Sequence, residues 1–372
     1  MLSRLRNLIV PKQIRNLSEI SLQHPYINHG SSTSINATYG VICSSNKLGQ
    51  RKDGVQLGPS TIINSESFKN FQKYISMQPH NWIQTYSASV EEKRTRFTEM
   101  EQRLDNMRNP IIWNASNISE SCYELFIKNL ECSERANLTL NIIGDHSSAI
   151  ASVMSSVVML NRVIKRKKIV LWIDAHADIN TPETSFTGNC HGMPLSIVSG
   201  LSDNYLKKHN IFKWLEDKPR FHLDNLIYVG VRDIDPGEAE IIKKHNIMCF
   251  TVQDIKDGNI NTLLRKINGS DIHISFDVDS LDPTYFRSTG TPVPHGLSPI
   301  DIKYLLKIIN HYGHIFKIDI TEFNPLIHEN INTSQSVAQI YKDKEVAIEK
   351  QIDIIVENVL KPVFTSSHMT IQ

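Results

Sequence analysis

Side chains of the types that bind metal ions gather at three points of the sequence, each directly after a short apolar run. The residues concerned are His146, Asp174, His176, Asp178, Asp277 and Asp279. Carboxylates that converge repel one another and lose hydration, so a cluster of this kind is stable only with cations among its members. The sequence therefore predicts a metal site, provided that the fold brings the three points together.

The kinds of ligand indicate which ions the cluster would bind. Many carboxylates, two imidazoles and no thiolate suit Mn²⁺ better than a structural zinc ion. The set is too large for one ion and suits two ions about 3.5–4 Å apart that share carboxylates. Two such ions lower the pKa of a bound water and supply hydroxide at neutral pH. The expected chemistry is hydrolysis at a dinuclear manganese centre.

Each motif has a simpler interpretation when it is taken alone. An Asp-X-Asp pair such as Asp277 and Asp279 is usually a turn or a solvated strand end. A single histidine such as His146 more often caps a helix or lies in a core with its hydrogen bonds satisfied. Only the joint occurrence of these motifs after three apolar runs favours a metal centre.

The apolar runs are typical of strands in a parallel sheet. They cover residues 39–43, 138–143, 168–173, 226–230, 247–252, 272–276 and 314–318. Helix-like stretches such as 147–163 and 299–311 separate them, which indicates βαβ units. The runs are apolar on both faces, as a sheet covered on both sides requires. We expect one doubly wound α/β domain with a central parallel sheet, helices on both faces and its ligands beyond the carboxyl ends of the strands.

The composition excludes several classes of function. The 372 residues are 40% hydrophobic and 21% charged, so the chain can bury a sizeable core. A net charge of +1 argues against nucleic acid as the main partner. No run of about 18 apolar residues occurs, so we expect no membrane-spanning helix.

The first 38 residues differ from the rest. They contain Arg4, Arg6, Lys12 and Arg15 against the single acid Glu19. An arginine-rich, acid-poor amphipathic start is typical of a mitochondrial transit peptide. We therefore expect residues 1–38 to direct the protein to the mitochondrial matrix and residues 39–372 to form the catalytic domain. The alternative is a disordered tail on a cytoplasmic protein.

Four sequence blocks together resemble the signature of the ureohydrolases, and most closely that of the arginases. They are Gly-Asp-His-Ser at 144–147, Asp-Ala-His-Ala-Asp at 174–178, Ser-Phe-Asp-Val-Asp at 275–279 and Asp-Ile-Thr-Glu at 319–322. The match extends from about Tyr39 to beyond Glu322. It implies an arginase-like fold, conversion of L-arginine and water to L-ornithine and urea, two Mn²⁺ per subunit and a homotrimer.

The resemblance also implies how the ligands divide between the two ions. The first Mn²⁺ would be held by His146, Asp174, Asp178 and Asp277. The second would be held by His176, Asp174, Asp277 and Asp279. Asp174 and Asp277 would therefore bridge the ions.

The amino-acid end of the substrate is assigned by the same resemblance. Asn180, Ser185 and Thr187, in the loop after the second ligand block, would bind the α-carboxylate through neutral donors. The two hydroxyl residues stand in the opposite order from the one more common in arginases. Asp235 would bind the α-ammonium group and Glu238 would support it. These contacts favour arginine over agmatine, which lacks the carboxylate.

Three residues are assigned to the reaction itself. The resemblance makes His191 a proton shuttle between the site and bulk water, and an imidazole titrates near neutral pH. Asp279 would pass a proton to the leaving amine, and Glu322 would lie beneath the guanidinium group. Thr291 would line the pocket.

Three alternatives remain open from the sequence. The first is a sibling hydrolase that acts on agmatine or on another guanidino or formimino compound. The second is a non-catalytic homologue that only binds arginine, although every expected ligand is present. The third is a related metal-dependent deacylase, for which we expect one metal ion and a different set of ligands.

Overall fold

The computed structural model of the chain describes residues 37–77, 81–85, 111–163, 166–327 and 337–365. The segment 1–36 lies outside the described residues, so the transit peptide and the mitochondrial location stay predictions. Within the described ranges, no helix combines the length and the apolar character that crossing a membrane requires.

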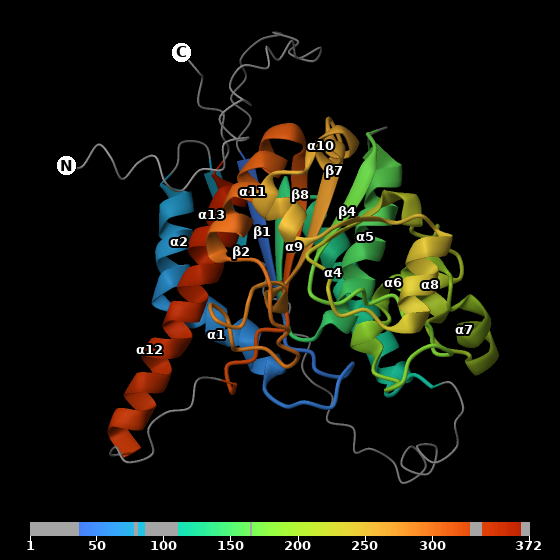
Figure 1. Ribbon diagram of the computed structural model, residues 1–372, viewed down its shortest axis with the longest axis horizontal. Coiled ribbons are helices and arrows are strands. Elements are labelled where there is room, and N and C mark those ends of the chain that lie inside the picture. The colour runs from blue at the N-terminus through green and yellow to red at the C-terminus, as the bar shows by residue number, and fades with distance from the viewer. Residues whose placement is uncertain (1–36, 78–80, 86–110, 164–165, 328–336, 366–372) are drawn as a thin grey trace.

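A parallel sheet of eight strands forms the centre of the structure (Figure 1). The strand order is β2-β1-β3-β8-β7-β4-β5-β6, and every neighbouring pair is parallel. The strands are β1 (Ala37–Ser44), β2 (Asn81–Thr85), β3 (Leu138–Ile143), β4 (Lys168–Ile173), β5 (Leu226–Val229), β6 (Met248–Phe250), β7 (Asp271–Asp277) and β8 (His314–Thr321).

Helices cover both faces of the sheet. One face packs against α1 (Gly58–Asn64), α2 (Glu66–Ser76), α10 (Asn261–Ile267), α11 (Pro299–Tyr312), α12 (Val337–Ile355) and α13 (Lys361–Phe364). The other packs against α4 (Ala115–Ser133), α5 (Ala149–Val163), α6 (Pro194–Ser199), α7 (Asp203–His209) and α8 (Pro236–Lys244). Figure 1 shows α4 and α5 on one side of the sheet and α2 and α13 on the other. The predicted doubly wound α/β fold is confirmed.

A hydrophobic core lies on each face of the sheet, and successive residues of a strand pack alternately into the two cores. Leu171 of β4 packs in one core, and its neighbour Trp172 packs in the other. Both are 0% exposed. This double burial explains why β4 appears in the sequence as a continuous apolar run. β7 and β8 differ from that expectation, because buried polar residues such as Ser275 and Lys317 alternate with their apolar ones.

Two strands differ from the prediction. β2 (Asn81–Thr85) is not among the predicted strands, and it pairs with β1 on the side opposite β3. The run 247–252 was expected to be one strand, whereas β6 ends at Phe250 and α9 (Val252–Asp257) begins almost at once. Thr251 and Asp254 form a capping box at the start of α9, which ends the strand early.

The sheet contains an unusual buried lysine, Lys317 of β8, which is 0% exposed. Its Nζ donates hydrogen bonds to the carbonyl of Ser152 at 3.3 Å and to the hydroxyl of Ser155. Burial, only partly offset by attraction to Asp319, lowers the pKa of Lys317 to about 8. Below that pH, the folded protein carries a buried charge at a cost in stability.

Replacing Lys317 with methionine is expected to stabilise the fold at pH 7 by about 1–3 kcal/mol, since one pKa unit corresponds to about 1.4 kcal/mol. The unfolded chain holds the lysine proton up to its ordinary pKa of 10.5, whereas the folded protein releases it near 8. The stability of the wild type should therefore rise with pH between these values, and the variant should lose that rise. Guanidinium chloride unfolding at several pH values measures both effects. Identical pH profiles for the two proteins would contradict the assignment.

Candidate active site

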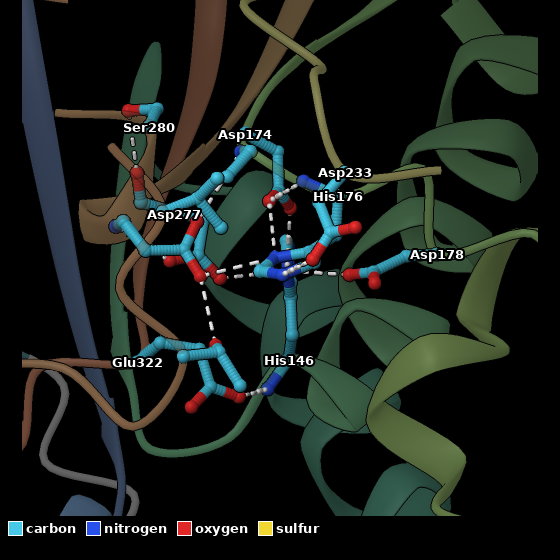
Figure 2. A network of polar contacts seen from close by, with 12 residues as sticks. His146, Asp174, His176, Asp178, Asp233, Asp277, Ser280 and Glu322 are labelled. Carbon is cyan, nitrogen blue, oxygen red and sulfur yellow. Dashed lines mark hydrogen bonds and ion pairs between the residues drawn. The ribbon is translucent and has the colours of Figure 1, made fainter. Parts of the chain in front are cut away.

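The end of β7 and the segments that follow β3, β4 and β7 bring the predicted metal ligands together at the carboxyl end of the sheet (Figure 2). The first group surrounds His146. Its Nδ1 lies 3.2 Å from Asp174, 2.9 Å from Asp178 and 3.1 Å from Asp277, in each case to Oδ2. Figure 2 shows the three carboxylates around the imidazole, Asp174 and Asp178 from the loop after β4 and Asp277 from the end of β7. His146, Asp174 and Asp277 bring ligand atoms within 4.8 Å of one another, and Asp178 lies beside His146.

The second group surrounds His176. Its Nδ1 lies 3.1 Å from Oδ2 of Asp279 and 3.5 Å from Oδ1 of Asp174. Asp174 thus faces His146 with one oxygen and His176 with the other, as a bridging ligand would. Asp277 has a ligand atom within 4.8 Å of those of His146 and Asp174, but it does not belong to the corresponding group of His176. Its Oδ1 accepts the backbone N–H of Asp279 at 2.9 Å, so bridging by Asp277 stays a prediction.

The cluster has the chemistry of a site built for cations. Nδ1 of His146 and Oδ2 of Asp174 are buried, and neither makes a hydrogen bond with the described residues. Buried polar atoms without a hydrogen bond are costly unless something else satisfies them. Carboxylate oxygens and imidazole nitrogens are ligands that suit Mn²⁺. The residues present therefore fit a pair of divalent cations.

The electrostatics of the cluster lead to the same conclusion. Burial and the neighbouring carboxylates of Asp279 and Asp174 raise the pKa of Asp277 well above its ordinary value. Burial and the charge of Asp174 raise the pKa of Asp178 to about 6. Burial of His146 favours its neutral form, but the surrounding carboxylates outweigh burial and raise its pKa well above the usual range. The cluster thus has an excess of negative charge that positive charge must balance.

Two residues without a predicted role orient the imidazole of His146. Its Nε2 is hydrogen-bonded to the hydroxyl of Ser275 at 2.8 Å, which leaves the Nδ1 lone pair facing the carboxylates when Nε2 carries the proton. The indole of Trp172 stacks on the ring with centroids 4.3 Å apart.

The backbone of Asp178 is left-handed, with φ of 49°, a conformation that is uncommon outside glycine and concentrates at functional sites.

Arg232, which binds backbone carbonyls of several loops, is another residue of the site that the sequence did not identify. Its guanidinium donates to the carbonyls of Asp279 at 2.8 Å, Val293 at 2.7 Å, Pro294 at 3.0 Å and Gly230 at 3.1 Å. The end of β5, the turn after β7 and the loop that carries Thr291 are thereby tied together. No signal for this role exists in the sequence, because the acceptors are backbone atoms of distant segments.

The predicted guanidinium-binding residue, Glu322, lies directly beside the first group. Its carboxylate accepts the backbone N–H of His146 at 2.8 Å, and the amide Nε2 of Gln50 donates to its two oxygens at 2.9 and 2.7 Å. Nδ1 of His191, the predicted shuttle, lies 3.4 Å from the same carboxylate. Burial opposes ionisation, but these hydrogen bonds hold the pKa of Glu322 below its ordinary value. Glu322 is thus an ionised carboxylate at the cluster.

The predicted amino-acid-binding residues lie on two facing loops. Nδ2 of Asn180 donates to Oδ2 of Asp235 at 2.8 Å. Glu238 accepts the backbone N–H groups of Ile179 at 3.1 Å and of Asp235 at 3.0 Å. Burial is the main cause that raises the pKa of Glu238 to about 7. Glu238 therefore fixes the loop after β4 to the start of α8.

The remaining predicted residues occupy the surrounding loops. Ser185 is half-buried and Thr187 exposed, and each hydroxyl accepts a nearby backbone N–H, from Gly188 and Asn189 respectively. The hydroxyl of Thr291 donates to Oδ2 of Asp279 at 2.9 Å. Thr291 therefore contacts a predicted metal ligand directly.

Two further acids near the cluster make structural hydrogen bonds. Asp282 accepts the backbone N–H groups of Thr284 at 2.9 Å and Gly296 at 3.0 Å, which holds its loop. Asp319 is 0% exposed and accepts hydrogen bonds from Asn141 at 2.6 Å and Ser152 at 2.8 Å. Neither contributes to the two groups of possible metal ligands.

The chain is similar in sequence to known arginases. The family model described as "Arginase family" matches residues 37–344. The arginase of Neurospora crassa is 31% identical over 322 residues, which cover 82% of this chain and 86% of the relative. The arginase of Staphylococcus aureus is 31% identical over 310 residues, which cover 81% and 94%.

Solved structures show the same fold. The crystal structure of Entamoeba histolytica arginase in complex with L-ornithine superposes with a TM-score of 0.67 and 27% identity, covering 87% of this chain and 99% of that one. The arginase of Bacillus caldovelox gives a TM-score of 0.69 at 23% identity, covering 90% and 100%. The resemblance that the signature blocks suggested is confirmed, and the chain belongs to the arginase family.

Proposed function

We propose that the protein hydrolyses L-arginine to L-ornithine and urea at a dinuclear manganese centre. The observation that carries this proposal is the pair of ligand groups around His146 and His176, which share Asp174 through its two oxygens. When bound, two manganese ions would supply hydroxide at neutral pH by lowering the pKa of water.

Glu322 would bind and orient the guanidinium group. A carboxylate complements the planar array of N–H donors of a guanidinium through charge-assisted hydrogen bonds. The carboxylate lies next to the first ligand group, with its position fixed by Gln50 and by the backbone of His146. This arrangement would hold the central carbon of the guanidinium over the metal cluster.

Proton transfer would use two residues, Asp279 and His191. Asp279 accepts hydrogen bonds from Thr291 and from the backbone of Ala175, which fix the carboxylate that would pass a proton to the leaving amine. His191, with 21% of its side chain exposed, contacts Glu322 and would exchange protons with bulk water. An imidazole in contact with both the site and solvent suits that task.

The α-carboxylate and α-ammonium groups distinguish arginine from alternative substrates such as agmatine, which lacks the carboxylate. The structure of the Entamoeba histolytica relative contains L-ornithine, the product that we propose here. Asn180, Ser185 and Thr187 would supply neutral donors to the α-carboxylate, and Asp235 would bind the α-ammonium group. The homotrimer that the sequence predicts stays a prediction.

Arginine is expected to be hydrolysed with a kcat/KM more than about tenfold above that of agmatine, because agmatine leaves the carboxylate-binding donors without a partner. Urea release with added Mn²⁺, measured for arginine, agmatine and other guanidino compounds, tests this order. A preference for agmatine would identify a sibling activity. Arginine binding without urea release would identify a non-catalytic homologue.

A further inference from the structure

The loop after β4 presents its two hydroxyl side chains in a defined way. The hydroxyl of Ser185 accepts the backbone N–H of Gly188 at 3.0 Å, and that of Thr187 accepts the backbone N–H of Asn189 at 3.2 Å. A hydroxyl has one donor as well as two acceptor positions. Since each oxygen already accepts a backbone bond, each O–H can donate to an anion outside the loop. The orientation of this short turn therefore decides where the anion is bound.

Trp113 holds the opposite side of the same turn. Its indole Nε1–H donates to the carbonyl of Thr187 at 2.8 Å, and its backbone N–H donates to the carbonyl of Gly188 at 3.0 Å. Trp113 is 5% exposed. One residue thus binds two consecutive carbonyls and fixes the peptide planes from which the hydroxyl side chains extend.

The contact between the turn and Trp113 is close. Gly188 has a φ of +70°, and a Cβ placed there would lie 2.8 Å from both Nε1 of Trp113 and Cγ2 of Ile111. A side chain at position 188 would push the turn away from the indole. Glycine is therefore required both by the backbone conformation and by the approach of Trp113.

Trp113 also contacts the loop that holds the guanidinium end of the site. The guanidinium of Arg51 lies over the indole, with Cζ 4.7 Å from the ring centroid. The neighbouring Asn114 donates to the carbonyl of Leu48 at 3.2 Å. The same loop carries Gln50, which donates to Glu322. Trp113 therefore lies between the loop proposed to bind the carboxylate and the loop that positions Glu322.

From these contacts we infer that Trp113 is a positioning residue for substrate specificity: it sets the distance between the two ends of the site and so favours substrates that carry an α-carboxylate. The inference rests on the proposed function. The contacts of Trp113 given above include none of the metal-binding residues. A substitution of Trp113 should therefore weaken binding of the amino-acid end of the substrate. The rate of the hydrolytic step should change little.

The test compares Trp113→Phe with Trp214→Phe. Both variants remove an indole N–H that donates to a carbonyl, since Nε1 of Trp214 donates to Ser119 at 3.1 Å. Phenylalanine keeps an aromatic ring for packing, so Trp113→Phe is expected to fold, and thermal melting checks this. The net value of one hydrogen bond predicts a rise of about three- to tenfold in KM for arginine in Trp113→Phe, with kcat nearly unchanged. Agmatine, measured as a substrate or as a competitive inhibitor, should bind as it does to the wild type. Trp214→Phe should change neither ligand.

Calorimetric titration of the manganese-loaded proteins with L-ornithine gives a second readout that does not depend on turnover. Trp113→Phe should bind ornithine about three- to tenfold more weakly than the wild type. The inference is overturned if Trp113→Phe leaves both the ratio of KM values for arginine and agmatine and the affinity for ornithine unchanged. It is also overturned if the variant binds arginine and agmatine more weakly by the same factor, which would show a merely structural role. Failure of the wild type itself to release urea from arginine refutes the proposed function instead, and the ornithine titration still decides the role of Trp113.

Discussion

Asp174→Asn is expected to lower manganese-dependent urea release from arginine by at least about a hundredfold, the upper end of the loss caused by removing a residue that merely orients a ligand. Asp174 faces both imidazoles of the cluster, with Oδ2 toward His146 and Oδ1 toward His176. Asparagine has nearly the same shape but carries no charge and offers only one ligand oxygen. Both proposed ion sites should therefore weaken together.

The measurement is urea release across a manganese titration, combined with the metal content of the dialysed protein. Asp217→Asn makes the same chemical change at an exposed position and should behave as the wild type. The fold of Asp174→Asn should persist, because asparagine has nearly the same shape and its oxygen can still accept the backbone N–H of His176, which Asp174 accepts at 2.7 Å. Full activity and normal metal content in Asp174→Asn would show that Asp174 is no shared ligand.

The second large effect is expected from Glu322→Gln. A hydrogen bond to a charged partner contributes about 1.5–3 kcal/mol, so the loss of the carboxylate should lower kcat/KM for arginine by about 10- to 150-fold. Glutamine can still accept the backbone N–H of His146, which keeps the loop in place. Manganese content should stay near that of the wild type, because Glu322 belongs to neither ligand group.

Steady-state kinetics and metal analysis together distinguish this variant from Asp174→Asn. Glu216→Gln, at an exposed position, serves as the matched control. A variant with normal kinetics would remove Glu322 from the substrate site. A variant that loses its manganese would instead assign Glu322 a role in holding the metal centre.

The strands that helices cover on both faces could be predicted from the sequence. β4 and β5, with the sequences KIVLWI and LIYV, are covered on both faces and appear as continuous apolar runs. β7 and β8 are also buried, but their apolar residues alternate with buried polar ones such as Ser275 and Lys317. β2, with the sequence NWIQT, has no such run and was missed. The boundary between β6 and α9 was wrong because the capping box formed by Thr251 and Asp254 outweighs the apolar character of that run.

The candidate site was predictable only in part, for a physical reason. Metal-binding residues that directly follow buried strands are recognisable, since parallel strands deliver their carboxyl ends to one edge of the sheet. Arg232 and Trp113 act on backbone carbonyls of segments distant in the sequence, and Ser275 acts on a histidine 129 residues away. Such contacts leave no local pattern, so only the three-dimensional structure identifies them.

The most direct test of the central claim is anomalous scattering at the manganese edge from crystals soaked in Mn²⁺. We expect two peaks about 3.5–4 Å apart, one beside His146 and one beside His176, with Asp174 between them. A single peak away from Asp174, or no peak within the cluster, would contradict the proposed dinuclear centre.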